Sequence, residues 1–335
     1  MSKKRKSPRV GRKYAKRKPK KHSRSGSSLR SRRVLSYRAA SNTRGKPKRK
    51  VIFRSTVHPS NAYPLAHHRV HLSFDAPLDA LPPSDSPVEV TSAGSTTHFD
   101  LAYQTSLGQA GASVAQYLRS ACEYDLQRTA NLFGLKWDAM HFTITVLQGN
   151  GGAWHPDPCS NTNIFAGVQT AILPNQIPNY LFLRSMVLSE IVEVLGSRFR
   201  WDCGCSNGEG LSRVISDFLV PAQRPNNFLS AKIWLAPPSA RGDFVSNTFQ
   251  GDDDHPGDRD YPSIGCSVLF LNWMHFQVGI PWEEIIDNGA ATLEQTYDAI
   301  VGSGSDAFGN FSSFINRNAE EVNARANVSD NVFPI

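Results

Sequence analysis

Hydrophobic and polar residues alternate in three short stretches of the chain. The alternation covers residues 87–92, His98–Tyr103 and His141–Leu147, and it predicts half-buried β-strands. Apolar residues recur at steps of three and four from Ser113 to Phe133, which predicts an amphipathic helix. A further short strand is expected over Ile164–Ile172. These patterns predict strands together with one long helix.

After Pro178, helical spacing predominates. Leu181–Asp217 contains two helix-like segments joined by a Gly- and Cys-rich loop, and each segment carries carboxylates among apolar residues. Cys266–Gln277 is apolar nearly all round, as expected of a core helix. Short helices are predicted to begin near Pro281, Thr292 and Asp306, with the proline at the first helical position.

Charge divides the chain into unlike parts. Residues 1–54 contain 23 of the 37 Lys and Arg residues and no Asp or Glu, so residues 55–335 contain the other 14 together with all 29 acidic residues. We expect residues 1–54 to be a disordered polycationic arm. A proline-rich linker (55–86), an α+β domain (87–317) and a polar, frayed tail (318–335) are expected to follow.

The arm carries dense runs of cations. Neutralising phosphates with such runs releases counterions and gives salt-dependent binding, and the same runs suit a nuclear-import signal. We therefore expect the arm to contact nucleic acid or the import machinery, through Lys3, Lys4, Arg5, Lys6, Lys16, Arg17, Lys18, Lys20 and Lys21. A solvated tail that folds back on the acidic domain is the alternative.

Targeting patterns for export and for membranes are missing from the sequence. No apolar h-region follows the N-terminal charges, and no window offers the roughly 18 apolar residues of a membrane span. We expect a nuclear or cytoplasmic protein without a membrane partner. A mitochondrial transit peptide is a minor alternative, because lysine predominates and no amphipathic Arg/Ser helix is evident.

Ser189-Glu190-Ile191-Val192-Glu193 stands in the register of the zinc-peptidase sequence His-Glu-x-x-His, in which two histidines bind zinc and the glutamate polarises a water. Downstream, Asn207 to Arg213 corresponds to the Asn-Glu-x-x-Ser-Asp type motif that supplies the third ligand in glutamate-zincin peptidases. The chain thus resembles a glutamate-zincin metallopeptidase with a degenerate motif.

Residues from about 121 to 315 are also similar to a bacterial family of uncharacterised function. The resemblance rests on five phrases: Cys122-Glu123-Tyr124-Asp125, Gly152-Ala153-Trp154-His155, Trp201-Asp202-Cys203-Gly204, the Asn207–Arg213 run, and Ser263 to Trp273. It implies a zincin-like fold. We therefore predict an α+β fold with a small mixed β-sheet packed on helices.

The resemblance breaks down at the metal ligands. Ser189, Glu193 and Glu209 offer zinc only oxygen atoms where imidazole is preferred. Buried carboxylates without a cation repel each other, so we expect the Arg213 guanidinium to pair with Glu209 or Glu193 where a metal once stood. Ser189, Glu193, Glu209 and Arg213 then form a degenerate-site cluster in a pseudoenzyme.

An active metal-dependent hydrolase is the first alternative. Glu190 occupies the position of the catalytic general base, and His155 is able to join Glu193 and Glu209 as a set of zinc ligands. A nucleic-acid-packaging viral coat protein is the second, because a polycation ahead of a globular domain suits genome neutralisation. The helical periodicity after Pro178 argues against the strands of a coat jelly roll.

The five cysteines leave three options open. Reduced thiols are favoured for Cys122, Cys159, Cys203, Cys205 and Cys266. A Cys159–Cys203 disulfide suits an exported domain, and His155 with Cys159 and the Cys203-Gly204-Cys205 run suits a tetrahedral metal site.

Overall fold

The computed structural model describes residues 88–149, 152–156, 158–168, 180–221, 230–236, 241–251 and 260–335. Over these residues the chain is an α+β domain in which a mixed sheet packs on helices, so the predicted fold class is confirmed. The expected arm (1–54) and linker (55–86) lie outside the described residues.

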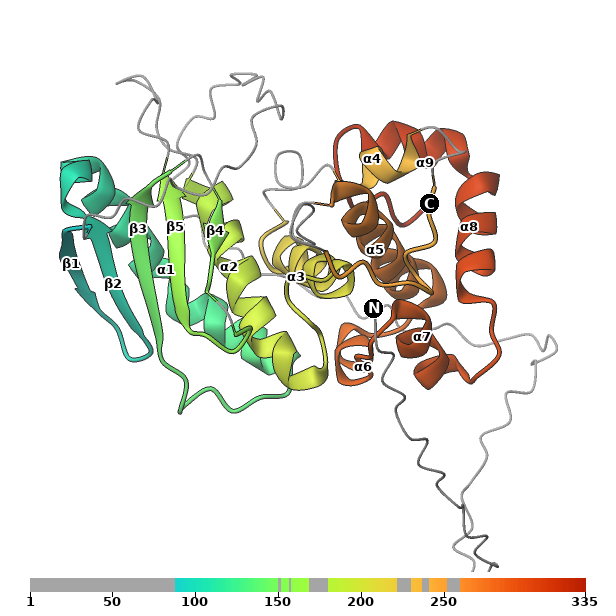
Figure 1. The fold of residues 1–335 in the computed structure, drawn as a ribbon, viewed down its shortest axis with the longest axis horizontal. Coiled ribbons are helices and arrows are strands. Elements are labelled where there is room, and N and C mark those ends of the chain that lie inside the picture. The colour runs from blue at the N-terminus through green and yellow to red at the C-terminus, as the bar shows by residue number, and fades with distance from the viewer. Residues whose placement is uncertain are drawn as a thin grey trace, which may run out of the picture. The chain divides into compact units, whose positions relative to one another are not determined.

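The sheet has five strands, in the order β1-β2-β3-β5-β4 (Figure 1). Antiparallel strands stand at both edges and the three central strands run parallel, with β1–β2 and β5–β4 forming the antiparallel pairs. The strands are β1 (Val90–Ser95), β2 (Phe99–Gln104), β3 (Phe142–Gln148), β4 (Ala153–Trp154) and β5 (Asn163–Val168). The predicted strands at 98–103 and 141–147 correspond to β2 and β3.

Helix α1 (Gly108–Leu132) follows a short 3-10 turn (Thr105–Leu107) and makes the crossover from β2 to the parallel strand β3. Its buried stripe packs against the strands and includes Val114, Leu118, Cys122 and Leu126 at spacings of four. The helix begins five residues before the predicted Ser113, because Gly108 to Ala112 are small or polar and add nothing to the apolar pattern.

Helix α2 (Tyr180–Gly196) lies between the sheet and the helical half of the domain. It contacts α1, β4 and β5 on one side and α3 (Ser206–Leu219) on the other, and α3 in turn packs on α5 (Tyr261–Trp273). Gly210 allows this last contact, because a Cβ there would meet the Cβ of Ser267 at 2.6 Å. The two segments predicted within Leu181–Asp217 are therefore α2 and α3.

The last part of the described chain is helical (Figure 1). After α4 (Ser230–Leu235), α5 continues into a π-helical turn (Met274–Val278), and the helices that follow are α6 (Trp282–Asp287), α7 (Leu293–Val301), α8 (Ala307–Arg317) and α9 (Ala319–Ala326). Pro281 is the residue before α6, one position ahead of the prediction. Thr292 and Asp306 cap α7 and α8 by accepting hydrogen bonds from backbone N–H groups.

The prediction of a frayed tail after Asn318 was wrong. Residues 319–326 form α9, whose Val322 and Ala326 are buried, and Val332 and Phe333 are buried beyond it. The few apolar residues of this segment are too widely spaced to reveal a helix by pattern, but they reach the core in the folded domain. The C-terminal segment is therefore part of the structure.

Asp330 joins the C-terminal segment to the start of α4. Its carboxylate accepts hydrogen bonds from the N–H and hydroxyl of Ser230 and from the N–H of Ala231. Burial raises the Asp330 pKa from 3.8 to about 6, although these hydrogen bonds and the charge of Arg213 act in the opposite direction. Folding therefore favours the protonated form of the Asp330 carboxyl over the ionised form.

We predict a pH-dependent stability that depends on Asp330. Because its pKa is raised in the folded state, its contribution is fully present below pH 3.8 and is lost as the pH rises through about 6. Relative to Asp330→Asn, which does not titrate, the wild-type free energy of unfolding should fall by about 3 kcal/mol across this window. Urea denaturation of both proteins at several pH values measures the difference, and a difference independent of pH would contradict the prediction.

Candidate functional site

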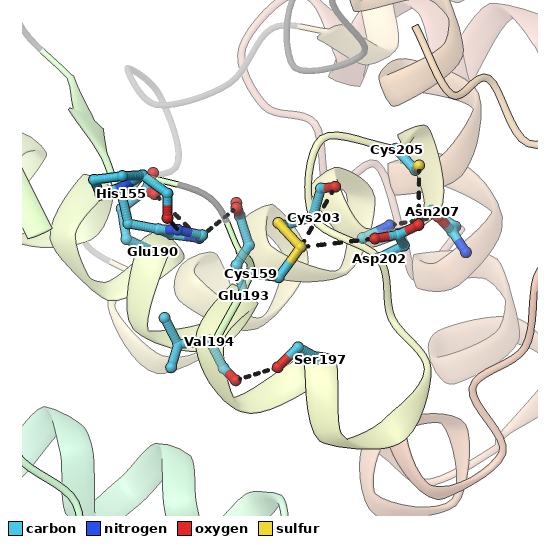
Figure 2. The surroundings of a disulfide bond; sticks show 12 residues. His155, Cys159, Glu190, Glu193, Val194, Ser197, Asp202, Cys203, Cys205 and Asn207 are labelled. Atoms are coloured by element: carbon cyan, nitrogen blue, oxygen red, sulfur yellow. Dashed lines mark hydrogen bonds and ion pairs between the residues drawn. A yellow bond between two sulfur atoms is a disulfide. The ribbon is translucent and has the colours of Figure 1, made fainter. Parts of the chain in front are cut away.

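Two carboxylates project from one side of α2 toward the loop that follows β4. Glu190 and Glu193 are three residues apart and therefore lie on neighbouring positions of the helix surface. His155 enters between them from the loop, with its Nε2 atom 3.5 Å from Glu193 Oε2 and 3.9 Å from Glu190 Oε2 (Figure 2). All three side chains are at most 13% exposed. The structure thus brings His155 to Glu193, as the hydrolase alternative requires.

The imidazole of His155 has a defined orientation. Its Nδ1 atom lies 3.2 Å from the carbonyl oxygen of Pro156, which can only accept a hydrogen bond, so Nδ1 carries a proton and donates it. Nε2 then faces the two carboxylates. A proton on Nε2 makes the ring a cation between two anions, and a lone pair on Nε2 makes it a metal ligand.

Ser189, which the sequence register matches to the first histidine of His-Glu-x-x-His, is buried on α2 and is 5% exposed. A neutral hydroxyl is a poor zinc ligand compared with imidazole. The Ser189 side chain therefore packs in the interior, and its hydroxyl attracts a cation only weakly.

Glu209 and Arg213 form an ion pair on α3. They are one helical turn apart, with Arg213 Nη2 3.8 Å from Glu209 Oε2, and both side chains are nearly buried. The guanidinium lies 5.8 Å from the centre of the Tyr261 ring of α5, and its charge partly opposes the rise in the Asp330 pKa that burial causes. Of the two partners hypothesised for Arg213, the structure places Glu209 beside it and pairs Glu193 with His155.

The residues hypothesised to bind zinc do not all meet. Within the described part of the chain, the group with metal-ligand atoms within 4.8 Å of one another consists of His155, Glu193 and Cys203. Glu209, which was expected to complete the set, is not in this group. It lies in the first turn of α3.

Cys159 and Cys203 form a disulfide bond, so the favoured prediction of five reduced thiols was wrong for this pair. The bond joins the loop before β5 to the turn before α3, across 44 residues of sequence, and it lies beside His155 and Glu193 (Figure 2). Cysteine spacing does not reveal which thiols meet, because the pairing depends on how these two loops approach α2.

The other three cysteines are free, as predicted, and the structure buries all three. Burial raises the pKa of Cys122 to about 11 and that of Cys205 to about 12, which keeps both as thiols. Cys205 donates a hydrogen bond to Asp202 Oδ2 at 3.5 Å. It therefore does not join Cys203 in the cluster next to His155.

A partly buried ion pair that the sequence did not suggest anchors α2 to α1. Arg184 donates two hydrogen bonds to Asp125, at 2.7 and 2.6 Å, in a bidentate arrangement. Asp125 raises the pKa of Arg184 despite its burial, so the charge is retained. An acid on the apolar stripe of α1 and an arginine within the apolar α2 are the signals that could have revealed this pair.

We compared the chain with known protein families and with curated proteins. No protein-family model matches the chain, and no curated protein matches it. Among the described residues, every helix is too short or too polar to traverse a lipid bilayer.

We predict that replacing Arg213 destabilises the domain. Arg213→Ala leaves the buried Glu209 carboxylate without its cation, which should lower the free energy of unfolding by about 3–5 kcal/mol. Urea denaturation at neutral pH measures this change.

Glu321→Gln is the matched control, because Glu321 and Arg325 have the same i,i+4 spacing on α9 but both are more than 40% exposed. We expect it to cost about 1 kcal/mol or less. Equal losses in the free energy of unfolding for the two substitutions would show that burial does not make the Arg213–Glu209 pair more stabilising than an exposed pair.

Proposed function

We propose that this chain is a non-catalytic, metallopeptidase-like protein whose basic arm binds nucleic acid. The observation that carries the proposal is the state of the would-be metal ligands on α2 and α3. Ser189 is buried where a histidine ligand would stand, and Glu209 is paired with Arg213. A guanidinium beside Glu209 supplies the positive charge that a metal supplies in an active peptidase.

The electrostatics of the site support a structural role for these carboxylates. Glu193 faces the imidazole of His155 and Glu209 faces Arg213, so each buried acid has a basic group of the protein next to it. A metal placed between Ser189, Glu193 and Glu209 would have to compete with Arg213 for Glu209, and it would gain only oxygen ligands. The proposed domain is thus a folded scaffold that presents the arm.

A metal-dependent hydrolase remains the second candidate, and the position of His155 favours it. The imidazole contacts both Glu193, a potential ligand, and Glu190, the potential general base. In such an enzyme Glu190 would take a proton from a metal-activated water. No observation on the described residues favours the coat-protein alternative.

A hydrolysis assay distinguishes the first two candidates. The full chain, supplied with zinc, should cleave unfolded protein substrates and peptide mixtures no faster than Glu190→Gln. This variant keeps the size of the side chain but removes the base. Cleavage by the wild type that is lost in Glu190→Gln would refute the non-catalytic proposal and establish the hydrolase.

The arm can be tested by the salt dependence of nucleic-acid binding. Each phosphate neutralised by a cation contributes about −0.9 to the slope of log K against log salt concentration on duplex DNA. Changing Lys3, Lys4, Arg5, Lys6, Lys16, Arg17, Lys18, Lys20 and Lys21 to glutamine in the full chain should therefore weaken binding and flatten the slope by several units.

Lys136→Gln with Lys232→Gln is the control, because both lysines are exposed on the described domain. Fluorescence anisotropy with labelled DNA and RNA duplexes measures affinity over a range of salt. An unchanged slope in the arm variant, or an equal loss in the control, would exclude the arm as the binding element.

A further inference from the structure

We infer that reduction of the Cys159–Cys203 disulfide creates a zinc site made of His155, Glu193, Cys159 and Cys203. The inference goes beyond the proposed function and rests on its non-catalytic reading, because the hydrolase alternative would use His155 and Glu193 for a zinc ion of its own. It differs from the peptidase-like arrangement because the ligands are thiolates and a loop histidine, with Ser189 and Glu209 left out. The site is regulated by the redox state of its own cysteines.

The distances around His155 fit ligands that share a metal ion. A nitrogen and an oxygen bound to one tetrahedral zinc at about 2.0–2.1 Å lie about 3.4 Å apart. His155 Nε2 and Glu193 Oε2 are 3.5 Å apart, which is longer than a good hydrogen bond of about 2.7–3.2 Å. The Cys203 sulfur lies within 4.8 Å of a ring nitrogen of His155 and of a carboxylate oxygen of Glu193. A shift of only about 1 Å would bring the Cys203 sulfur to bonding distance of a zinc ion held by His155 and Glu193.

The orientation of His155 prepares Nε2 to bind the metal. Its Nδ1 atom donates a hydrogen bond to the Pro156 carbonyl, and this is the outer contact that metal-binding histidines commonly make. The side chain of Glu193 is held by the rigid, buried helix α2. The site thus has one ligand fixed on a helix and one fixed by a backbone hydrogen bond, both buried next to the disulfide (Figure 2).

The disulfide and the metal use the same sulfur atoms and exclude each other. A dithiol reductant gives up two electrons and two protons, which break the S–S bond, form the thiols of Cys159 and Cys203, and leave the reductant as a disulfide. Zinc then displaces one proton from each thiol to form two Zn–S bonds. The Cys159 sulfur lies outside the group of atoms within 4.8 Å of one another, but it is bonded to the Cys203 sulfur in the oxidised state, so after reduction it must move toward His155 and Glu193 to become the fourth ligand.

The proposed site has four protein ligands and is therefore closed. A zinc ion with two sulfurs, one nitrogen and one oxygen has its tetrahedral positions filled, with none left for the water of a hydrolase. The zinc would join α2, the loop before β5 and the turn before α3, including the two segments that the disulfide joins. Reduction would thus exchange one cross-link for another.

Zinc binding by the two redox forms of the full chain tests the inference. The protein is prepared oxidised, or reduced with excess dithiol and freed of it by anaerobic gel filtration, and each form is titrated with Zn²⁺ alone. We expect the reduced form to bind one zinc at this site and the oxidised form to bind none there. His155→Ala, Glu193→Gln and Cys203→Ser should each weaken zinc binding by the reduced form about 100-fold or more.

Cys205→Ser is the matched control. Cys205 is two residues from Cys203 and buried, but its sulfur donates to Asp202 and is not in the ligand group. This variant should bind zinc as the reduced wild type does. The inference is overturned if the reduced wild type binds no stoichiometric zinc, if both redox forms bind equally, or if Cys205→Ser weakens binding as much as Cys203→Ser.

Cobalt binding can be measured on the wild-type protein alone, so this test does not depend on whether any variant folds. Co²⁺ added to the reduced wild type should produce thiolate-to-cobalt charge-transfer absorption and the visible bands of a tetrahedral site, which oxidation to the disulfide should abolish. Absence of the charge-transfer band from the reduced protein would also overturn the inference. Hydrolysis is not measured in these experiments, so their failure leaves the proposed function to its own test.

Discussion

The burial of α2 on nearly all sides is the constraint on which the site and much of the fold depend. The helix lies between the sheet and α3, and most of its residues from Leu183 to Gly196 are out of solvent. A charge in such a place is costly unless an opposite charge or hydrogen bonds accompany it. The charged side chains that α2 carries therefore determine which segments must lie beside it.

The neighbours of α2 meet this requirement from different parts of the chain. Arg184 is matched by Asp125 of α1, and Glu193 by His155 of the loop after β4. Glu209 of α3, the nearest helix on the other side, has its own partner in Arg213. These contacts explain how the carboxylates of a buried helix are accommodated by the protein's own basic groups. The Cys159–Cys203 disulfide adds a covalent link at the same place.

The same arrangement connects the proposed function with the proposed zinc site. With the disulfide formed, the His155 and Glu193 side chains pair with each other, and the cysteines are unavailable as ligands. Reduction would add two soft ligands next to a histidine and a carboxylate that are already close. A domain without hydrolytic activity would then still respond to the redox conditions around it.

The sequence by itself determined the local features. Alternation identified β2 and β3, apolar spacing identified α1, α2, α3 and α5, and the i,i+4 spacing of Glu209 and Arg213 put that pair within reach on one helix. From the residue types, the sequence also suggested His155 and Glu193 as ligands of the same zinc ion. Period and spacing are properties of neighbouring residues, so they can be read without knowing the fold.

Only the tertiary structure decided which distant residues meet. The contact of His155 with Glu193, the pairing of Cys159 with Cys203, the Asp125–Arg184 bridge and the docking of residues 319–333 each join segments far apart in sequence. No local pattern encodes such contacts, because they follow from how the loops and helices pack around α2. Ser189-Glu190-x-x-Glu193 therefore suggested a site, and packing determined that its carboxylates face a histidine and a disulfide.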